Sequence, residues 1–422
     1  MEALILASHT CSAASNLLYV HAESYFDEDF LDKWRFFSDV DPTHGAVEYV
    51  GRKAAFAAGL VNRTQERVYV GVDMKSVVGS NGKGRRSVRL ESNEEYNSGL
   101  FIVTLDHMPT GCGTWPALWL FGGDVKHPWP SWGEFDIIEG AHKSTQAMST
   151  LHTASGCDQS PVVPGRDFTT RWHRGTQKAP ARDCDVHADG QFENQGCSQA
   201  GPENSMGSSF NAFNGGTFAA EWDPLAGHIR SWFWPAGSEP FDVIMKHPAP
   251  SSWGKPYSYF RLDPVTCPAS HFRNMRIVLD LTLCGDYGEA TFKDSCPEVA
   301  DDLSCKDFVL KHPEQMREAY WSIRNLDVYH AAGLNLGSSN LLNTLTVLKR
   351  FQLGALEALR GTRAVWFLPH MSWNLQVFVV SIVLLALGHV LFKVRHWARW
   401  PIPGRGCNRR ELSIYSQLEL DI

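Results

Sequence analysis

The stretch Trp129–Gly140, WPSWGEFDIIEG, places three carboxylates in a short and otherwise apolar segment rich in strand-forming residues. Side chains alternate between the two faces of a strand, so Glu134 and Asp136 share one face, whereas Glu139 would point to the other face of a regular strand. One extra residue near Ile137 shifts this alternation, and such bulges are frequent beside active sites. We therefore expect a bulged strand that carries all three acids on one face.

Two glutamates on one strand face suit the hydrolysis of a glycosidic bond. Their expected separation of about 5 to 5.5 Å is that of a retaining, double-displacement mechanism. In this interpretation Glu134 is the nucleophile and Glu139 is the general acid and base, while Asp136 orients Glu134 and keeps the two glutamate pKa values apart. The alternative is a solvated acidic strand at a sheet edge.

The chain resembles glycoside hydrolase family 16, especially its fungal laminarinase-like, or endo-1,3(4)-beta-glucanase, branch. Besides the motif E-x-D-x-x-E, seven other stretches resemble segments of that branch and occur in the same order along the chain. They are DPTHGAVEY at 41–49, SVRLESNEEY at 87–96, HMPTGCGTWPALW at 107–119, LHTASGC at 151–157, EWDPLAGHIRSWFWPAGSEP at 221–240, LDLTLCGDYG at 279–288 and CKDFV with EAYWSIRNLDVY within 305–329. The resemblance covers roughly residues 20–330. It implies an all-β fold, a concanavalin A-like β-sandwich or jelly roll, that acts on a beta-glucan polysaccharide or oligosaccharide. It implies no catalytic cofactor and assigns no metal.

The resemblance also implies substrate-binding residues. Trp119 and Trp129 match aromatic residues that line the family's cleft, with core tryptophans as the alternative. His152 should lie on the strand after the catalytic one, near enough to hydrogen-bond a substrate or Glu139, with a structural histidine as the alternative. The chain departs from the family at two positions. Trp132 stands where a small residue is usual and adds a stacking surface or narrows the cleft, and Tyr287 replaces a cleft tryptophan. Both departures affect subsite preference and leave the proton chemistry intact.

The composition of the chain fits a secreted or lumenal all-β enzyme. Its 422 residues suffice for one large sandwich with appendages, and short apolar runs between turn-forming residues occupy most of residues 25–330. A net charge of -7 and a pI near 6.2 argue against nucleic acid as a partner, and a neutral polysaccharide needs no charge steering. We expect a monomer.

Cysteine usage predicts an oxidising compartment. The region from 112 to 305 contains an even number of cysteines with no C-x-x-C pair, which favours disulfides over a metal site. Their connectivity is open. Asn62-Arg63-Thr64 is an N-glycosylation sequon, and an unmodified turn is its alternative.

The segment 373–392 has the length and apolar character of a single transmembrane helix. A buried soluble helix is the alternative. The flanking cations Lys393, Arg395, Arg399, Arg405, Arg409 and Arg410 place the tail 393–422 in the cytosol and the catalytic domain outside the cell or in a lumen. We thus expect a single-pass membrane protein.

The remaining segments are less clearly defined. Residues 1–19 have an apolar run with Glu2 and no basic start, and so make a poor signal peptide; either the C-terminal segment directs translocation or the start of the chain is incomplete. Residues 331–372 form a connector with leucines at helical spacing, which predicts an amphipathic helix unless the gene boundary is misread.

Three functions remain open at this point. The first is a membrane-anchored endo-beta-glucanase that hydrolyses beta-1,3 or mixed beta-1,3/1,4 glucans with retention. The second is a cell-wall glucan transglycosylase on the same scaffold. The third is a non-catalytic glucan-binding sensor, against which the presence of Glu134 and Glu139 argues.

Overall fold

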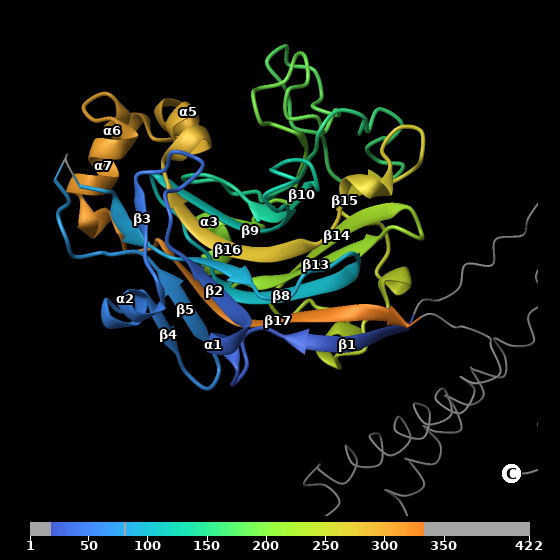
Figure 1. Ribbon diagram of the computed structural model, residues 1–422, viewed down its shortest axis with the longest axis horizontal. Helices are drawn as coiled ribbons and strands as arrows, with labels where there is room; N and C mark the ends of the chain where they lie inside the picture. Colours follow the sequence, from blue (N-terminus) through green and yellow to red (C-terminus); the bar gives the residue numbers. More distant parts are fainter. Residues whose placement is uncertain (1–17, 80–81, 333–422) are drawn as a thin grey trace, which may run out of the picture. The chain divides into compact units, whose positions relative to one another are not determined.

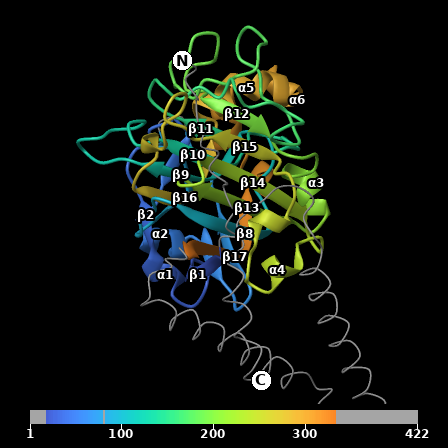
Figure 2. The same cartoon turned by 90° about the vertical axis from the view of Figure 1, so that its right-hand side faces the viewer.

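A computed structural model describes residues 18–79 and 82–332. Two antiparallel sheets pack face to face, as Figure 1 shows, and Figure 2 gives the same sandwich turned by 90°. The predicted all-β sandwich is therefore confirmed for these residues.

The seven-stranded sheet has the order β12-β11-β10-β9-β16-β7-β2. Its strands are β2 (Trp34–Phe37), β7 (Arg89–Ser92), β9 (Thr114–Gly122), β10 (Glu134–Glu139), β11 (Met148–His152), β12 (Cys197–Ala200) and β16 (Met275–Leu283). The acidic motif thus forms β10, which lies inside the sheet between β9 and β11. The alternative of an acidic strand at a sheet edge is wrong.

The eight-stranded sheet has the order β15-β14-β13-β8-β17-β5-β4, with β1 also paired to β17. Its strands are β1 (Leu18–Ser24), β4 (Val61–Arg63), β5 (Val68–Gly71), β8 (Gly99–His107), β13 (Gly216–Asp223), β14 (His228–Pro235), β15 (Ser258–Arg261) and β17 (Tyr320–Ala332). A parallel pair, β3 (Val47–Tyr49) and β6 (Arg85–Ser87), completes the strands.

The described helices are short and lie outside the two sheets (Figure 1). They are α1 (Phe30–Lys33), α2 (Arg52–Ala57), α3 (Gly207–Ala212), α4 (Phe241–Ile244), α5 (Gly285–Ser295), α6 (Pro297–Ala300) and α7 (Cys305–Lys311), with 3-10 turns at Pro250–Ser252, Ala269–His271 and Pro313–Met316. Helices α5, α6 and α7 gather at one end of the sandwich, next to the end of β16.

Alternation along β9 separates the core from the outer face of the seven-stranded sheet. Leu118 and Leu120 are fully buried in the core between the sheets, whereas Trp115 and Trp119 are only partly buried. Since neighbouring residues of a strand point to opposite faces, these tryptophans lie on the outer face.

The predicted bulge in β10 is confirmed. Asp136 pairs with Trp119 of β9, but the next pair joins Ile138 to Leu118, so Ile137 is the extra residue. The pairing with β11 shifts at the same place. The hydroxyl of Tyr257 donates a hydrogen bond of 3.3 Å to the carbonyl oxygen of Ile137, which satisfies a main-chain group at the bulge.

The expectation of disulfides in the catalytic region is also confirmed. The four bonds are Cys112–Cys296, Cys157–Cys267, Cys184–Cys197 and Cys284–Cys305. Two of them stabilise the long segment between β11 and β12, and the other two connect α5, α6 and α7 to the strands.

Most of the predicted appendages lie outside the described residues. These are residues 1–17 of the N-terminal segment, nearly all of the connector 331–372, the transmembrane helix 373–392 and the tail 393–422. Within the part of the chain that the structure describes, every helix is too short or too polar to cross a bilayer.

Candidate active site

The bulge brings Glu134, Asp136 and Glu139 to the outer face of the seven-stranded sheet. Two tryptophan side chains hold the outer two acids: Trp129 Nε1 donates to Glu134 Oε2 at 2.7 Å, and Trp115 Nε1 donates to Glu139 Oε1 at 2.9 Å. Each bond favours the ionised form of its carboxylate. The structure therefore brings the three predicted acids together.

His152 ends β11 and lies directly opposite Glu134 in the strand pairing. Its Nε2 atom is 3.0 Å from Asp136 Oδ2 and 3.6 Å from Glu134 Oε1. The residue His152 is 8% exposed and Asp136 is 2% exposed. His152 thus contacts the middle acid and the first one rather than Glu139.

Burial sets the protonation of the acids. Removal from water, together with the neighbouring Asp136, raises the pKa of Glu134 to about 8 and that of Glu139 to about 7. Burial also raises the pKa of Asp136 well above its usual range, helped by the charge of Asp280. At neutral pH the three carboxyl groups therefore share protons and titrate as a coupled set.

Asp280 on β16 adds a fourth buried carboxyl group to the same face. It pairs with Ala117 of β9, and Ala117 in turn pairs with Glu139, so a single small residue separates the two acids across the sheet. Burial raises the pKa of Asp280 to about 7, and Arg89 opposes this rise. The guanidinium of Arg89 lies 4.9 Å from the ring centroid of Trp119, so it also supports that ring.

The aromatic residues predicted to bind substrate have different surroundings. Trp119 lies beside Asp136 and is partly buried, and Trp129 is 40% exposed next to Glu134. Trp132 stacks on His127 with ring centroids 4.2 Å apart. Tyr287, in the first turn of α5, makes an edge contact of 5.8 Å with Trp115, and its hydroxyl lies 3.9 Å from Met148 Sδ.

Glu134, Asp136 and His152 are also arranged as the ligands of a metal cation could be. Glu134, Asp136 and His152 each offer a ligand atom, and these atoms lie within 4.8 Å of one another. A pair of carboxyl groups needs no metal for acid and base catalysis of glycoside cleavage. The same three residues can therefore take part in proton transfer without a bound ion.

Sequence reasoning missed four residues of this site: Trp115, Arg89, Asp280 and Tyr257. Three carried a readable signal: Trp115 is four residues before Trp119 on the same strand, and Asp280 is a charge inside the apolar run VLDLTL. Arg89 alternates with apolar neighbours in the same way. Tyr257 carried no signal, since it reaches β10 from the segment just before β15, far away in the sequence.

Comparison with known proteins agrees with this geometry. Residues 34–329 match the family model for the XgeA-like, catalytic GH16 domain. An endo-1,3(4)-beta-glucanase of Arthroderma benhamiae is 40% identical over 74% of this chain and 65% of its own length, and one of Emericella nidulans is 37% identical over 76% and 48%. A probable glycosidase of Schizosaccharomyces pombe is 36% identical over 74% and 69%. The chain thus spans about half to two thirds of the length of the first two relatives.

Two solved structures show the same fold. An elongating GH family 16 beta-1,3-glucosyltransferase is 36% identical, with a TM-score of 0.64 over 74% of this chain and 100% of that one. Laminarinase 16A from Phanerochaete chrysosporium is 32% identical, with the same TM-score and coverage, and was solved with beta-glucans in donor and acceptor sites.

The hydrogen bond from Trp129 gives a testable prediction. Trp129→Phe keeps an aromatic ring but removes the donor to Glu134, so the Glu134 carboxyl should titrate at higher pH, by roughly half to one pH unit. Carbon-13 NMR of glutamate side-chain carboxyls measures this. Trp132→Phe, which removes no bond to an acid, is the control. Equal titration of Glu134 in both variants would disprove the role of Trp129.

Proposed function

Because the chain belongs to glycoside hydrolase family 16, we propose that it is an endo-beta-glucanase that hydrolyses beta-1,3 or mixed beta-1,3/1,4 glucans. The observation that carries the proposal is the bulge at Ile137, since it gathers two tryptophan-held glutamates on one partly accessible face. The relatives named endo-1,3(4)-beta-glucanases support the substrate class.

We propose a retaining mechanism in two steps. Glu134 attacks the anomeric carbon and forms a glycosyl-enzyme, while Glu139 gives a proton to the departing oxygen. Glu139 then takes a proton from the incoming water, which releases the sugar with its original configuration. Asp136, kept protonated by burial, can donate a hydrogen bond that stabilises ionised Glu134.

In the free protein burial raises the pKa of both glutamates, so the proton is not confined to Glu139. The roles require the proton to lie on Glu139 when the sugar is bound. A glycosidic oxygen beside Glu139 accepts a hydrogen bond only from the protonated acid, and positive charge developing on the sugar favours ionised Glu134. Substrate binding thus selects the reactive protonation state.

Replacing the nucleophile tests the assignment. Glu134→Gln should lower kcat on laminarin by more than about 1,000-fold while laminarin binding is retained, since the amide cannot form the glycosyl-enzyme. Release of reducing ends and calorimetric binding report the two properties. Glu66→Gln, at an exposed position in the β4–β5 hairpin, is the matched control. Undiminished turnover by Glu134→Gln would defeat the assignment, and binding without turnover by the unmodified protein would favour a glucan-binding sensor.

A transglycosylase is the second candidate, because an elongating glucosyltransferase with 36% identity shares the fold. Both reactions pass through the same glycosyl-enzyme and differ in whether water or a sugar hydroxyl accepts the glycosyl group. If the protein is mainly a hydrolase, laminari-oligosaccharides at high concentration should yield shorter products only, as separated by chromatography. A dominant series of longer products would assign it as a transferase.

We also propose that segment 373–392 anchors the protein in a membrane, with the catalytic domain outside the cytosol. The support is the length and apolar character of the segment, together with the basic residues that follow it. The intact protein should remain in the membrane fraction after an alkaline wash, and a variant without 373–392 should not. Release of the intact protein by the wash would refute the anchor.

A further inference from the structure

Only one of the two ring nitrogens of His152 contacts a polar group of the described residues, and the other is buried without a hydrogen-bond partner. Its Nε2 atom faces Asp136 and Glu134, whereas its Nδ1 atom has no hydrogen-bond partner among the described residues. A histidine ring is usually oriented by a hydrogen bond at its second nitrogen. Packing must therefore hold this ring in place.

Gly196, immediately before β12, covers the unpartnered edge. Its backbone has φ +60, and a Cβ atom at this position would lie 2.9 Å from His152 Nδ1 and 2.2 Å from the carbonyl oxygen of Leu151. Only glycine allows the main chain to approach so closely in this conformation. The backbone at Gly196 is thus the wall against which the His152 ring packs.

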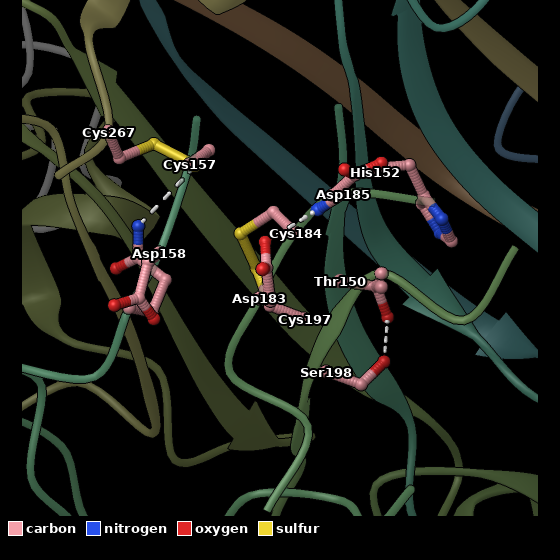
Figure 3. The surroundings of a disulfide bond; sticks show 12 residues. Thr150, His152, Cys157, Asp158, Asp183, Cys184, Asp185, Cys197, Ser198 and Cys267 are labelled. Atoms are coloured by element: carbon pink, nitrogen blue, oxygen red, sulfur yellow. Dashed lines mark hydrogen bonds between the residues drawn. A yellow bond between two sulfur atoms is a disulfide. The ribbon is translucent and has the colours of Figure 1, made fainter. Parts of the chain in front are cut away.

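A disulfide closes the loop that contains this wall. Cys184 and Cys197 are both fully buried and bonded, so residues 184–197 form a closed loop beside β11 (Figure 3). Gln191 Nε2 donates to the Gly196 carbonyl oxygen at 2.8 Å. The loop is tied to the end of β11, because the N–H of Thr153 donates to the Cys184 carbonyl oxygen at 2.8 Å.

Further contacts link β12 and the loop to their surroundings. The hydroxyls of Thr150 and Ser198 form a 2.6 Å hydrogen bond between β11 and β12 (Figure 3). The N–H of Cys184 donates to the carbonyl oxygen of Cys157, and the side chain of Cys157 forms a disulfide with Cys267. The loop therefore has little freedom to move away from His152 while the Cys184–Cys197 bond is intact.

We propose that the closed loop Cys184–Cys197 is a positioning element that acts through Gly196: it holds the His152 ring against Asp136 and Glu134. The glycosidase site is then competent only while this disulfide is formed. This inference rests on the proposed function for its kinetic readout, and its structural part is independent of turnover.

A pair of glycine variants tests the proposal in the full chain. Gly196→Ala places a methyl group against the ring, and Gly190→Ala is the matched control, because Gly190 has φ +77 in the same loop but meets no atom closer than 3.5 Å. Gly196→Ala should lower kcat on laminarin about 10- to 100-fold with KM changed less than about threefold, whereas Gly190→Ala should keep kcat near the original value. An equal effect of both variants would overturn the proposal.

A disulfide variant keeps the test decisive if Gly196→Ala does not fold. Cys184→Ala with Cys197→Ala should shift the His152 imidazole signals in nitrogen-15 NMR and lower kcat, whereas Cys112→Ala with Cys296→Ala should do neither. Unchanged His152 signals in the first pair would refute the positioning role. If the unmodified protein shows no turnover of any beta-glucan, the proposed function fails, and the NMR comparison still decides whether the loop holds His152.

Discussion

The extra residue at Ile137 is the constraint on which the site depends. Without it, the pleat would turn Glu139 into the core between the sheets, where an unpaired carboxyl group is strongly unfavourable. With it, β10 presents three acids on one face and still buries Ile137 and Ile138 in the core. The hydroxyl of Tyr257, which immediately precedes β15 of the eight-stranded sheet, donates to the carbonyl oxygen of Ile137 and so helps to maintain the bulge. The geometry of the acids is therefore a property of both sheets.

Sequence patterns were sufficient for the features encoded within single strands. The alternation and the misplaced acid in WGEFDIIEG predicted both the strand and its bulge, and the even number of cysteines predicted disulfides. The patterns were insufficient where distant segments meet. Trp115, Tyr257 and the Gly196 backbone contact β10 or β11 from strands and loops whose positions depend on the whole fold. Which cysteines pair could not be deduced from the sequence for the same reason.

The charged groups of the site extend from β10 across the seven-stranded sheet to β7. Glu139, Asp280 and Arg89 follow one another across neighbouring strands, with Ala117 between the first two. A buried carboxyl group is tolerated when it is protonated or paired. The positive charge of Arg89 partly offsets the cost of burying ionised Asp280. For the acids of β10, burial favours the protonated form and so lowers the number of buried charges. This set keeps protons available near neutral pH, as acid catalysis requires.

The two departures from the family lie at opposite ends of the acids of β10, Trp132 near Glu134 and Tyr287 near Glu139. Trp132 precedes Glu134 and packs on His127, whereas Tyr287 lies beside Trp115 at the Glu139 end. Neither donates a hydrogen bond to an acid of β10 among the described contacts. A change at either end therefore alters what surrounds the sugar chain while the hydrogen bonds on Glu134 and Glu139 stay in place. In the proposed retaining mechanism hydrolysis and transfer share one glycosyl-enzyme, so the choice between them would depend on these surroundings rather than on β10.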